Sequence, residues 1–230
     1  KASASIADIN ITGQVDIVFV IDTTGSMRNY ILNVKNNLKS FVDDIENAGI
    51  KPNFALVKYE DITHDGVNST EVKKNGSSNW FMNTDKFKDA ISKLTLGDGG
   101  DWPETAIDGL EMAHQLDMRN SAQKFIILVT DADYKVANNY EIKSMKDLAQ
   151  SLKSDKINTS VVTANKYKET YKILYDTTGG IIADINGNFK DELIKISDKI
   201  NEETNSGYWI ALKGLIPQIV KLDEKPSANS

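Results

Sequence analysis

VDIVFVIDTTGSM (residues 15–27) joins an apolar run to a short polar loop. An apolar run of this kind is typical of a strand that is buried on both faces in the middle of a parallel sheet. The segment that follows repeats apolar side chains at helical spacing, at Ile31, Val34, Leu38, Val42 and Ile45. The local order is therefore strand, polar loop and helix. This order places the loop beyond the carboxyl end of a strand, where open α/β sheets bind ligands.

Strands and helices are expected to alternate through most of the chain. Apolar runs predict further strands at residues 53–59, 124–130, 157–164 and 180–184. Helical spacing predicts helices at residues 85–94, 106–116, 142–153, 168–176 and 189–203. Residues 67–73 and 78–82 flank an Asn-Gly pair and are typical of a β-hairpin that supplies an antiparallel edge strand. This order predicts an α/β fold with a doubly wound, mainly parallel, six-stranded sheet and helices on both faces.

The same alternation of strands and helices sets the expected domain boundaries. Residues 1–13 are small and polar and are interpreted as a lead-in, and residues 14–203 are expected to form one domain. Residues 204–230 break this alternation and are interpreted as a C-terminal extension with two candidate short strands and a polar linker. The chain starts at Lys1 without a methionine or a signal peptide, so we expect it to be a piece of a longer protein.

Composition excludes several classes of function. The 230 residues carry a net charge of -6, and only Arg28 and Arg119 are arginines, which argues against a nucleic-acid-binding surface. The chain has no cysteine, so a disulfide framework, a thiolate nucleophile and cysteine-ligated zinc are excluded. No apolar run approaches the roughly 20 residues that a membrane-spanning helix needs, so no membrane insertion of this fragment is expected.

The polar loop after the first strand offers a set of oxygen ligands. Asp22, Thr24 and Ser26 alternate along it, so in an extended turn their side chains can converge on one point. One carboxylate and two hydroxyls suit a small hard cation and leave its charge only partly neutralised. Gly25 allows a left-handed or tightly folded backbone there. The alternative is an ordinary strand-to-helix turn in which Ser26 caps the helix.

Further acids are expected near this loop. Asp61 and Asp131 follow predicted strands, and Asp101 and Glu104 lie in a glycine-rich loop before a predicted helix. The carboxyl ends of parallel strands lie along one edge of a sheet, so these acids can approach Asp22. The sequence therefore predicts a divalent cation site at that edge. Asp61 and Asp133 are expected to support the site or to be solvated rather than to bind the cation directly.

Three segments carry a family resemblance: DTTGSM (residues 22–27), GGDWPE (99–104) and VTD (129–131). Together with the order of elements over residues 13–203, they resemble the von Willebrand factor type A domain, a Rossmann-like fold, and its metal-ion-dependent adhesion site (MIDAS). The resemblance implies that Ser26 and Thr24 coordinate the cation through their hydroxyls, and that Asp22 and Asp131 act directly or through water. The second loop has an Asp-x-Pro-Glu form similar to integrin β subunits. This form implies Glu104 as the ligand, with Asp101 as the alternative and Thr105 as a helix cap.

The implied activity is binding, without catalytic residues. Mg²⁺ is the expected cation, with Mn²⁺ or Ca²⁺ as alternatives, and its open position would accept an acidic side chain of a protein ligand. Composition resembles that of a bacterial surface protein, because the chain is rich in lysine and asparagine and lacks cysteine. We therefore expect a secreted, cell-wall-associated adhesion module that binds an extracellular matrix or surface protein.

Two alternatives remain open. One is an intracellular assembly subunit that partners an ATPase or chelatase, as in other members of the family that the chain resembles. The other, less favoured, is a metal-dependent hydrolase. A serine hydrolase that used Ser26 would need a well-placed histidine, and we expect His64 to be solvated on a loop and His114 to lie at the surface or in packing.

Overall fold

The computed structural model of the chain describes residues 14–47, 51–98, 100 and 102–187. The predicted helix at 189–203, the C-terminal extension at 204–230 and the candidate ligand Asp101 lie outside these residues. Strands and helices alternate along the described chain in the order β1 (Gln14–Asp22), η1 (Gly25–Asn29), α1 (Ile31–Asn47), β2 (Lys51–Tyr59), β3 (Glu71–Val72), α2 (Thr84–Ser92), α3 (Ala106–His114), β4 (Gln123–Thr130), α4 (Met145–Ser154), β5 (Ile157–Thr163), η2 (Asn165–Tyr167), α5 (Lys172–Thr178) and β6 (Ile182–Asp184). The elements η1 and η2 are short 3₁₀ helices.

The predicted sheet is confirmed. The described residues form six strands in the order β3-β2-β1-β4-β5-β6, of which β3 alone is antiparallel to its neighbour. β1 is central and pairs in parallel with both β2 and β4, so that Val20 lies between Val57 and Leu128. Since the order reverses direction on either side of β1, the loops after β1 and β4 lie next to each other at the carboxyl edge of the sheet.

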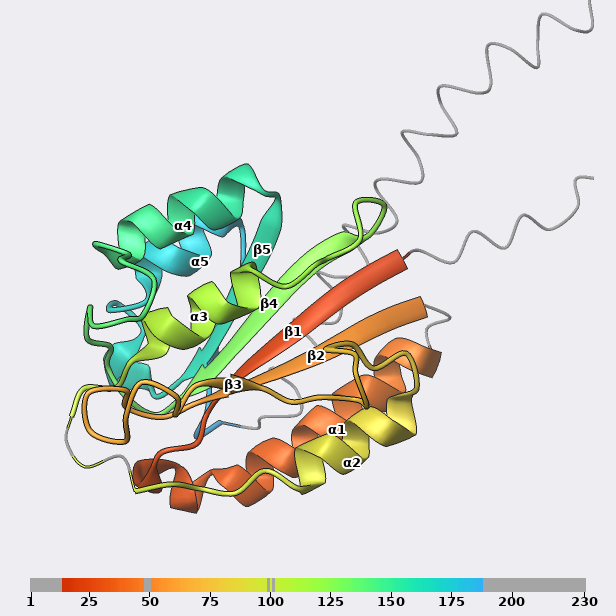
Figure 1. Cartoon of the computed structure of the whole chain (residues 1–230), viewed down its shortest axis with the longest axis horizontal. Coiled ribbons are helices and arrows are strands. Elements are labelled where there is room, and N and C mark those ends of the chain that lie inside the picture. Colours follow the sequence, from red (N-terminus) through yellow and green to blue (C-terminus); the bar gives the residue numbers. More distant parts are fainter. Residues whose placement is uncertain (1–13, 48–50, 99, 101, 188–230) are drawn as a thin grey trace, which may run out of the picture.

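The apolar run of β1 supplies two cores. Alternate side chains of a strand point to opposite faces. Phe19 and Ile21 accordingly pack with α1 and α2 on one face, whereas Val18 and Val20 pack with α3, α4 and α5 on the other. All four are fully buried, and Figure 1 shows the two helical layers on either side of the strands. Burial on both faces explains why the run has no polar residue between positions 17 and 21.

Aromatic rings fill the core beneath α1 and α2. The ring centroid of Phe19 lies 5.8 Å from that of Phe41 and 5.7 Å from that of Phe87. The rings of Phe54 and Phe87 stack with their centroids 4.7 Å apart. This cluster joins β1, β2, α1 and α2, and it fixes the strand that ends in Asp22.

The predicted hairpin forms differently from the expectation. Its Asn-Gly turn is present, because Asn75 and Ser78 exchange backbone hydrogen bonds and Gly76 has a φ of +67°. Its arms, however, lie mainly along β2: β3 pairs with the end of that strand, and Phe81 exchanges two backbone hydrogen bonds with Phe54 near its start. β2 is otherwise an edge strand, so its free backbone groups attract both arms.

One expected cap is corrected where α3 begins, whereas α2 begins at a regular cap. Asn83 caps α2, because its side chain accepts a hydrogen bond from the N–H of Lys86. Thr105 precedes α3 without capping it. Its hydroxyl instead donates to the carbonyl of Glu60 at 2.7 Å and accepts from the N–H of Ile62 at 3.1 Å. Thr105 therefore ties the start of α3 to the loop after β2.

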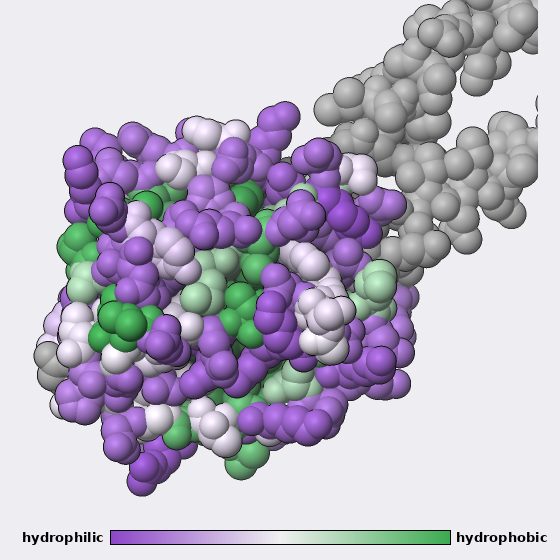
Figure 2. All heavy atoms as spheres, in the orientation of Figure 1, coloured by the Kyte–Doolittle hydropathy of each residue, from purple (hydrophilic) through white to green (hydrophobic). Residues whose placement is uncertain are grey.

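The surface is mainly polar on the face that Figure 2 presents, where hydrophobic residues occur in small groups. Among the described residues, no helix combines the length and the apolar character that crossing a bilayer requires.

Candidate metal centre

The loop after β1 gathers three oxygen donors. Asp22 ends the strand and is fully buried. Its Oδ1 accepts the N–H of Thr24 at 2.9 Å and the Thr24 hydroxyl at 2.6 Å. The hydroxyl oxygens of Thr24 and Ser26 lie 3.1 Å apart. Ser26 lies inside η1, so the interpretation of this loop as an ordinary turn capped by Ser26 is wrong.

The loop after β4 completes this arrangement. The hydroxyl of Ser26 donates to Oδ1 of Asp131 at 2.7 Å, across 105 residues of sequence. The hydroxyl of Thr130 donates to Oδ2 of Asp22 at 2.7 Å. A row of short oxygen–oxygen contacts thus runs from one carboxylate to the other through the hydroxyls of Thr24 and Ser26. Each hydroxyl gives its one proton to a carboxylate, so the contact between the two hydroxyl oxygens has no hydrogen of its own.

Glu104 reaches the same edge from the segment before α3. Its N–H donates to the carbonyl of Asp133 at 3.0 Å, and its carbonyl accepts the N–H of Lys135 at 2.8 Å. These bonds hold its backbone beside the loop after β4. The Glu104 side chain is buried, and its Oε2 has no hydrogen-bond partner among the described residues. An unpartnered buried carboxylate oxygen is unfavourable unless a positive group meets it.

The charges at this edge are poorly compensated. Burial, followed by the carboxylates of Asp22 and Asp61, raises the pKa of Glu104 to about 8. Burial also raises the pKa of Asp22 to about 6, although hydrogen bonds from Thr24 oppose the shift. Burial raises the pKa of Asp131 above its ordinary value too, against a hydrogen bond from Ser26. Three carboxylates that resist ionisation in this way suit a site that a cation neutralises.

The donors fit a hard divalent cation only if the hydroxyls take part. Within the described chain, no three histidine, cysteine or acidic side chains form a metal-holding group by themselves. The hydroxyls of Thr24 and Ser26 stand between Asp22 and Asp131, so they are placed to make the direct contacts. All five described residues of the predicted ligand set therefore meet at the carboxyl edge.

Gly25 allows the loops to pack closely. It does not adopt a left-handed backbone, since its φ is not among the positive values of the described glycines. A Cβ at this position would lie 2.7 Å from the carbonyl oxygen of Asp98. The N–H of Gly25 donates to that oxygen, and the N–H of Gly97 donates to the carbonyl of Thr23. The close approach of this second loop, rather than an unusual φ, explains the glycine.

Lys135 supports the site and carries no recognisable sequence signal. Its Nζ lies 2.6 Å from Oδ2 of Asp61, which is fully buried and also accepts the hydroxyl of Thr63. Asp61 therefore holds neighbouring loops together, as expected of a supporting acid. The sequence analysis also assigns no role to Thr130, although its place directly before Asp131 at the end of an apolar run is a usable signal.

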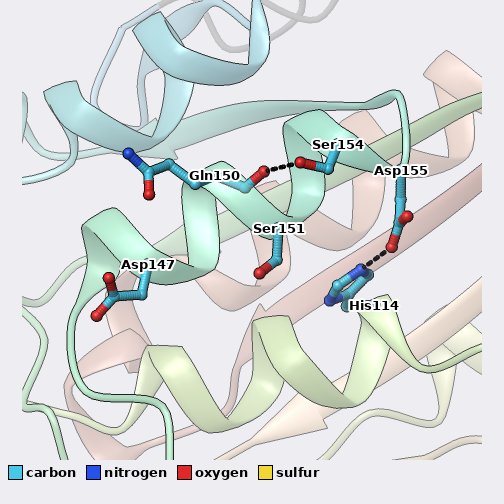
Figure 3. Close-up of a pocket in the computed structure, with 6 residues that line it drawn as sticks. All are labelled: His114, Asp147, Gln150, Ser151, Ser154 and Asp155. Atoms are coloured by element: carbon cyan, nitrogen blue, oxygen red, sulfur yellow. Dashed lines mark hydrogen bonds and ion pairs between the residues drawn. The ribbon is translucent and has the colours of Figure 1, made fainter.

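A polar pocket of about 490 Å³ lies between the end of α3 and the length of α4. Figure 3 shows His114 at the end of α3 facing Asp155, beside the polar side chains of α4. The ring nitrogens of His114 lie 3.1 Å from Glu111 and 2.7 Å from Asp155. α3 starts near Glu104 and runs away from it, so this pocket is separate from the candidate metal centre.

Comparisons with known proteins agree with this fold. The family model described as the von Willebrand factor A domain matches residues 16–187. The alpha-protein kinase vwkA of Dictyostelium discoideum is 24% identical over 160 residues, which cover 66% of this chain and 24% of the kinase. The chain therefore spans about a quarter of that relative.

Solved structures of proximal thread matrix protein 1 from the mussel byssus are also similar. One crystal form has a TM-score of 0.55 at 21% identity. A second structure, with a zinc-occupied MIDAS motif, has a TM-score of 0.57 at 20% identity. Both matches cover 85% of this chain and 46% of the mussel protein, so the chain spans about half of it. The match of the family model and the shared fold establish that this chain belongs to the von Willebrand factor A domain family.

Proposed function

We propose that the chain is a metal-dependent protein-binding module with a MIDAS-type divalent cation site. Ser26 and Thr24 would hold the cation through their hydroxyls, with Asp22, Asp131 and Glu104 acting directly or through water. The unpartnered Oε2 of Glu104, buried near two other carboxylates, is the observation that carries this proposal. The zinc-occupied MIDAS motif of the mussel protein supports a divalent cation in this fold.

Mg²⁺ is the proposed cation because every proposed donor is an oxygen atom, the ligand type that magnesium prefers. Bound there, it would supply a positive charge and an exchangeable position for a carboxylate of a partner protein. The protein's part is to hold the hydroxyls in place: Asp22 accepts from Thr24, and Asp131 accepts from Ser26. Both bonds leave hydroxyl lone pairs available to a cation.

Binding is favoured over catalysis by what surrounds Ser26. Its hydroxyl donates to Asp131, whose carboxylate is ordinarily a weaker base than the imidazole of a histidine. Of the two histidines in the chain, His64 pairs with Asp65 on an exposed loop and His114 lies at the opposite edge. A serine nucleophile needs a base within hydrogen-bond reach. The kinase named among the relatives is matched over a quarter of its length, and we assign no catalytic residue to this chain.

The proposed setting is the cell surface of a bacterium, where the chain would act as an adhesion module of a larger protein. The absence of cysteine and the lysine-rich composition support it. The proposed partner is an extracellular matrix or surface protein that presents an acidic side chain to the cation.

Calorimetric titration of the 230-residue chain with MgCl₂, MnCl₂, CaCl₂ and ZnCl₂ tests the site. We expect one cation per chain, and we expect Ser26→Ala and Glu104→Gln to lower the affinity at least tenfold. Ser151→Ala is the matched control, because it removes an exposed hydroxyl from α4 beside the distant pocket. Equal affinity of Ser26→Ala and Ser151→Ala would refute the assignment. A screen against immobilised matrix proteins, with Mg²⁺ or with EDTA, then tests the binding function.

A further inference from the structure

Exposed apolar side chains concentrate around the candidate metal centre. Five of the six large hydrophobic residues that are exposed in the described chain belong to segments at the carboxyl edge: Leu32, Val67, Trp102, Val136 and Ile173. They come from the starts of α1 and α5, from the loops after β2 and β4, and from the segment before α3. The sixth, Met82, follows Phe81, which pairs near the start of β2 at the opposite edge. Figure 1 shows these loops gathered at one end of the sheet.

Trp102 is the largest of these side chains, and it is held in place while 49% of it is exposed. Its ring centroid lies 5.9 Å from that of Tyr167. The Nζ of Lys166 lies 4.8 Å from the Trp102 ring and 4.6 Å from the Tyr167 ring. The cluster Trp102–Lys166–Tyr167 therefore joins the segment before α3 to the segment after β5. Cation–π contact restrains the lysine yet leaves its charge exposed.

The cluster lies beside the metal loops. β5 pairs in parallel with β4, so the segment after β5 that carries Lys166 lies next to the loop after β4 that carries Asp131. Trp102 stands two residues before Glu104. The segment 165–172 carries three lysines and one glutamate. Lys172 pairs with Asp176, whereas Lys166 contacts the two rings. A positive charge and an apolar surface thus stand next to the place where a partner's carboxylate would bind.

We propose that the cluster Trp102–Lys166–Tyr167 is a second contact for the protein ligand. It would select an acidic segment that has a second carboxylate near the metal-bound one and an apolar side chain beside them. The second carboxylate would pair with Lys166, and the apolar side chain would pack on the exposed face of Trp102. This inference rests on the proposed function. Aromatic residues at such positions commonly carry much of the binding energy of an interface.

Peptide binding to the Mg²⁺-loaded 230-residue chain tests it. The probes are three blocked peptides, Gly-Asp-Gly-Gly, Gly-Asp-Glu-Gly and Leu-Asp-Glu-Leu, with affinities measured by calorimetry. We expect affinity to rise along this series. Each step of the series should raise the affinity by about tenfold. Lys166→Ala should remove the increase between the first and the second peptide, and Trp102→Ala should remove the increase between the second and the third. Lys153→Ala and Met82→Ala, exposed residues at the opposite edge, should change neither increase.

Separate readouts distinguish the outcomes. Mg²⁺ titration without peptide should show that neither Trp102→Ala nor Lys166→Ala loses metal affinity, and circular dichroism should show that both fold. If Mg²⁺ does not bind the parent chain, the proposed function fails. If Mg²⁺ binds but the three peptides bind equally or not at all, the second contact is refuted. Binding of vesicles of phosphatidylserine and phosphatidylcholine that depends on Trp102 but not on Mg²⁺ would assign the cluster to a membrane surface and would also overturn the proposal.

Discussion

Thr130 tests the architecture of the candidate metal centre without removing any proposed ligand. Its hydroxyl donates to Oδ2 of Asp22 at 2.7 Å and accepts the N–H of Ala132 at 3.1 Å. All three residues are fully buried. Thr130→Val keeps the shape of the side chain and removes both hydrogen bonds. Thr130→Ser keeps the hydroxyl and removes a methyl group.

The expected loss of stability for Thr130→Val is the sum of two costs, because the carboxylate of Asp22 and the N–H of Ala132 each lose their hydrogen-bond partner. A hydrogen bond to a charged group contributes about 1.5–3 kcal/mol, and an unpaired buried N–H costs about 1 kcal/mol more. We therefore expect Thr130→Val to lower the free energy of unfolding by about 2.5–4 kcal/mol. Thr130→Ser should lose about 1 kcal/mol, the contribution of one buried methyl group.

Urea denaturation in the presence of a chelator, at pH 8, measures both variants. At this pH the carboxyl of Asp22, whose pKa is about 6, is ionised. The two variants should also differ in a magnesium titration. Thr130→Val should bind magnesium more weakly than the parent chain, and Thr130→Ser should bind it nearly as well. Equal stability of the two variants would refute the reasoning, because it would mean that the hydroxyl does not hold Asp22.

Three further predictions address the rest of the molecule. The hydrogen bond to Glu111 raises the pKa of His114 above its ordinary value of 6.5. The charged imidazole therefore stabilises the fold below pH 6.5, and this contribution disappears as the pH rises through the higher pKa of the folded state. Urea denaturation should accordingly show a larger loss for His114→Gln at pH 6 than at pH 9. Phe54→Ala should cost about 3–5 kcal/mol in the same assay, because its buried ring stacks on Phe87. Gly25→Ala should weaken magnesium binding in calorimetry, because its Cβ would meet the carbonyl of Asp98 at 2.7 Å and move the metal loop, and unchanged affinity would contradict the close approach of the two loops.

The fold was predictable because its signals are local and strong. The run from Val15 to Ile21 had to be a strand covered on both faces, and alternating strands and helices allow few other architectures. The meeting of Asp22 with Asp131 followed from topology alone, since parallel strands place their carboxyl ends along one edge. Ser26, four residues into the loop, was then within reach of Asp131.

What could not be predicted depends on contacts between distant backbones. Backbone hydrogen bonds to Asp133 and Lys135 hold Glu104 in its buried position, and no local sequence pattern predicts these bonds. Thr105 resembles a cap in sequence, yet the loop after β2 takes its hydroxyl. Asn83 and Thr84 are both capping residues by type, so only the backbone geometry decides between them.

The hairpin between β2 and α2 has a consequence for how separate copies of the chain meet. Its arms occupy the outer backbone groups of β2 at Phe54, Leu56 and Lys58. β3 itself offers an incoming strand two residues, followed by two lysines. Such a short, charged border is a poor template for intermolecular pairing. On this side the sheet resists aggregation, and deletion of the hairpin would uncover a long apolar strand on which fibrils could nucleate.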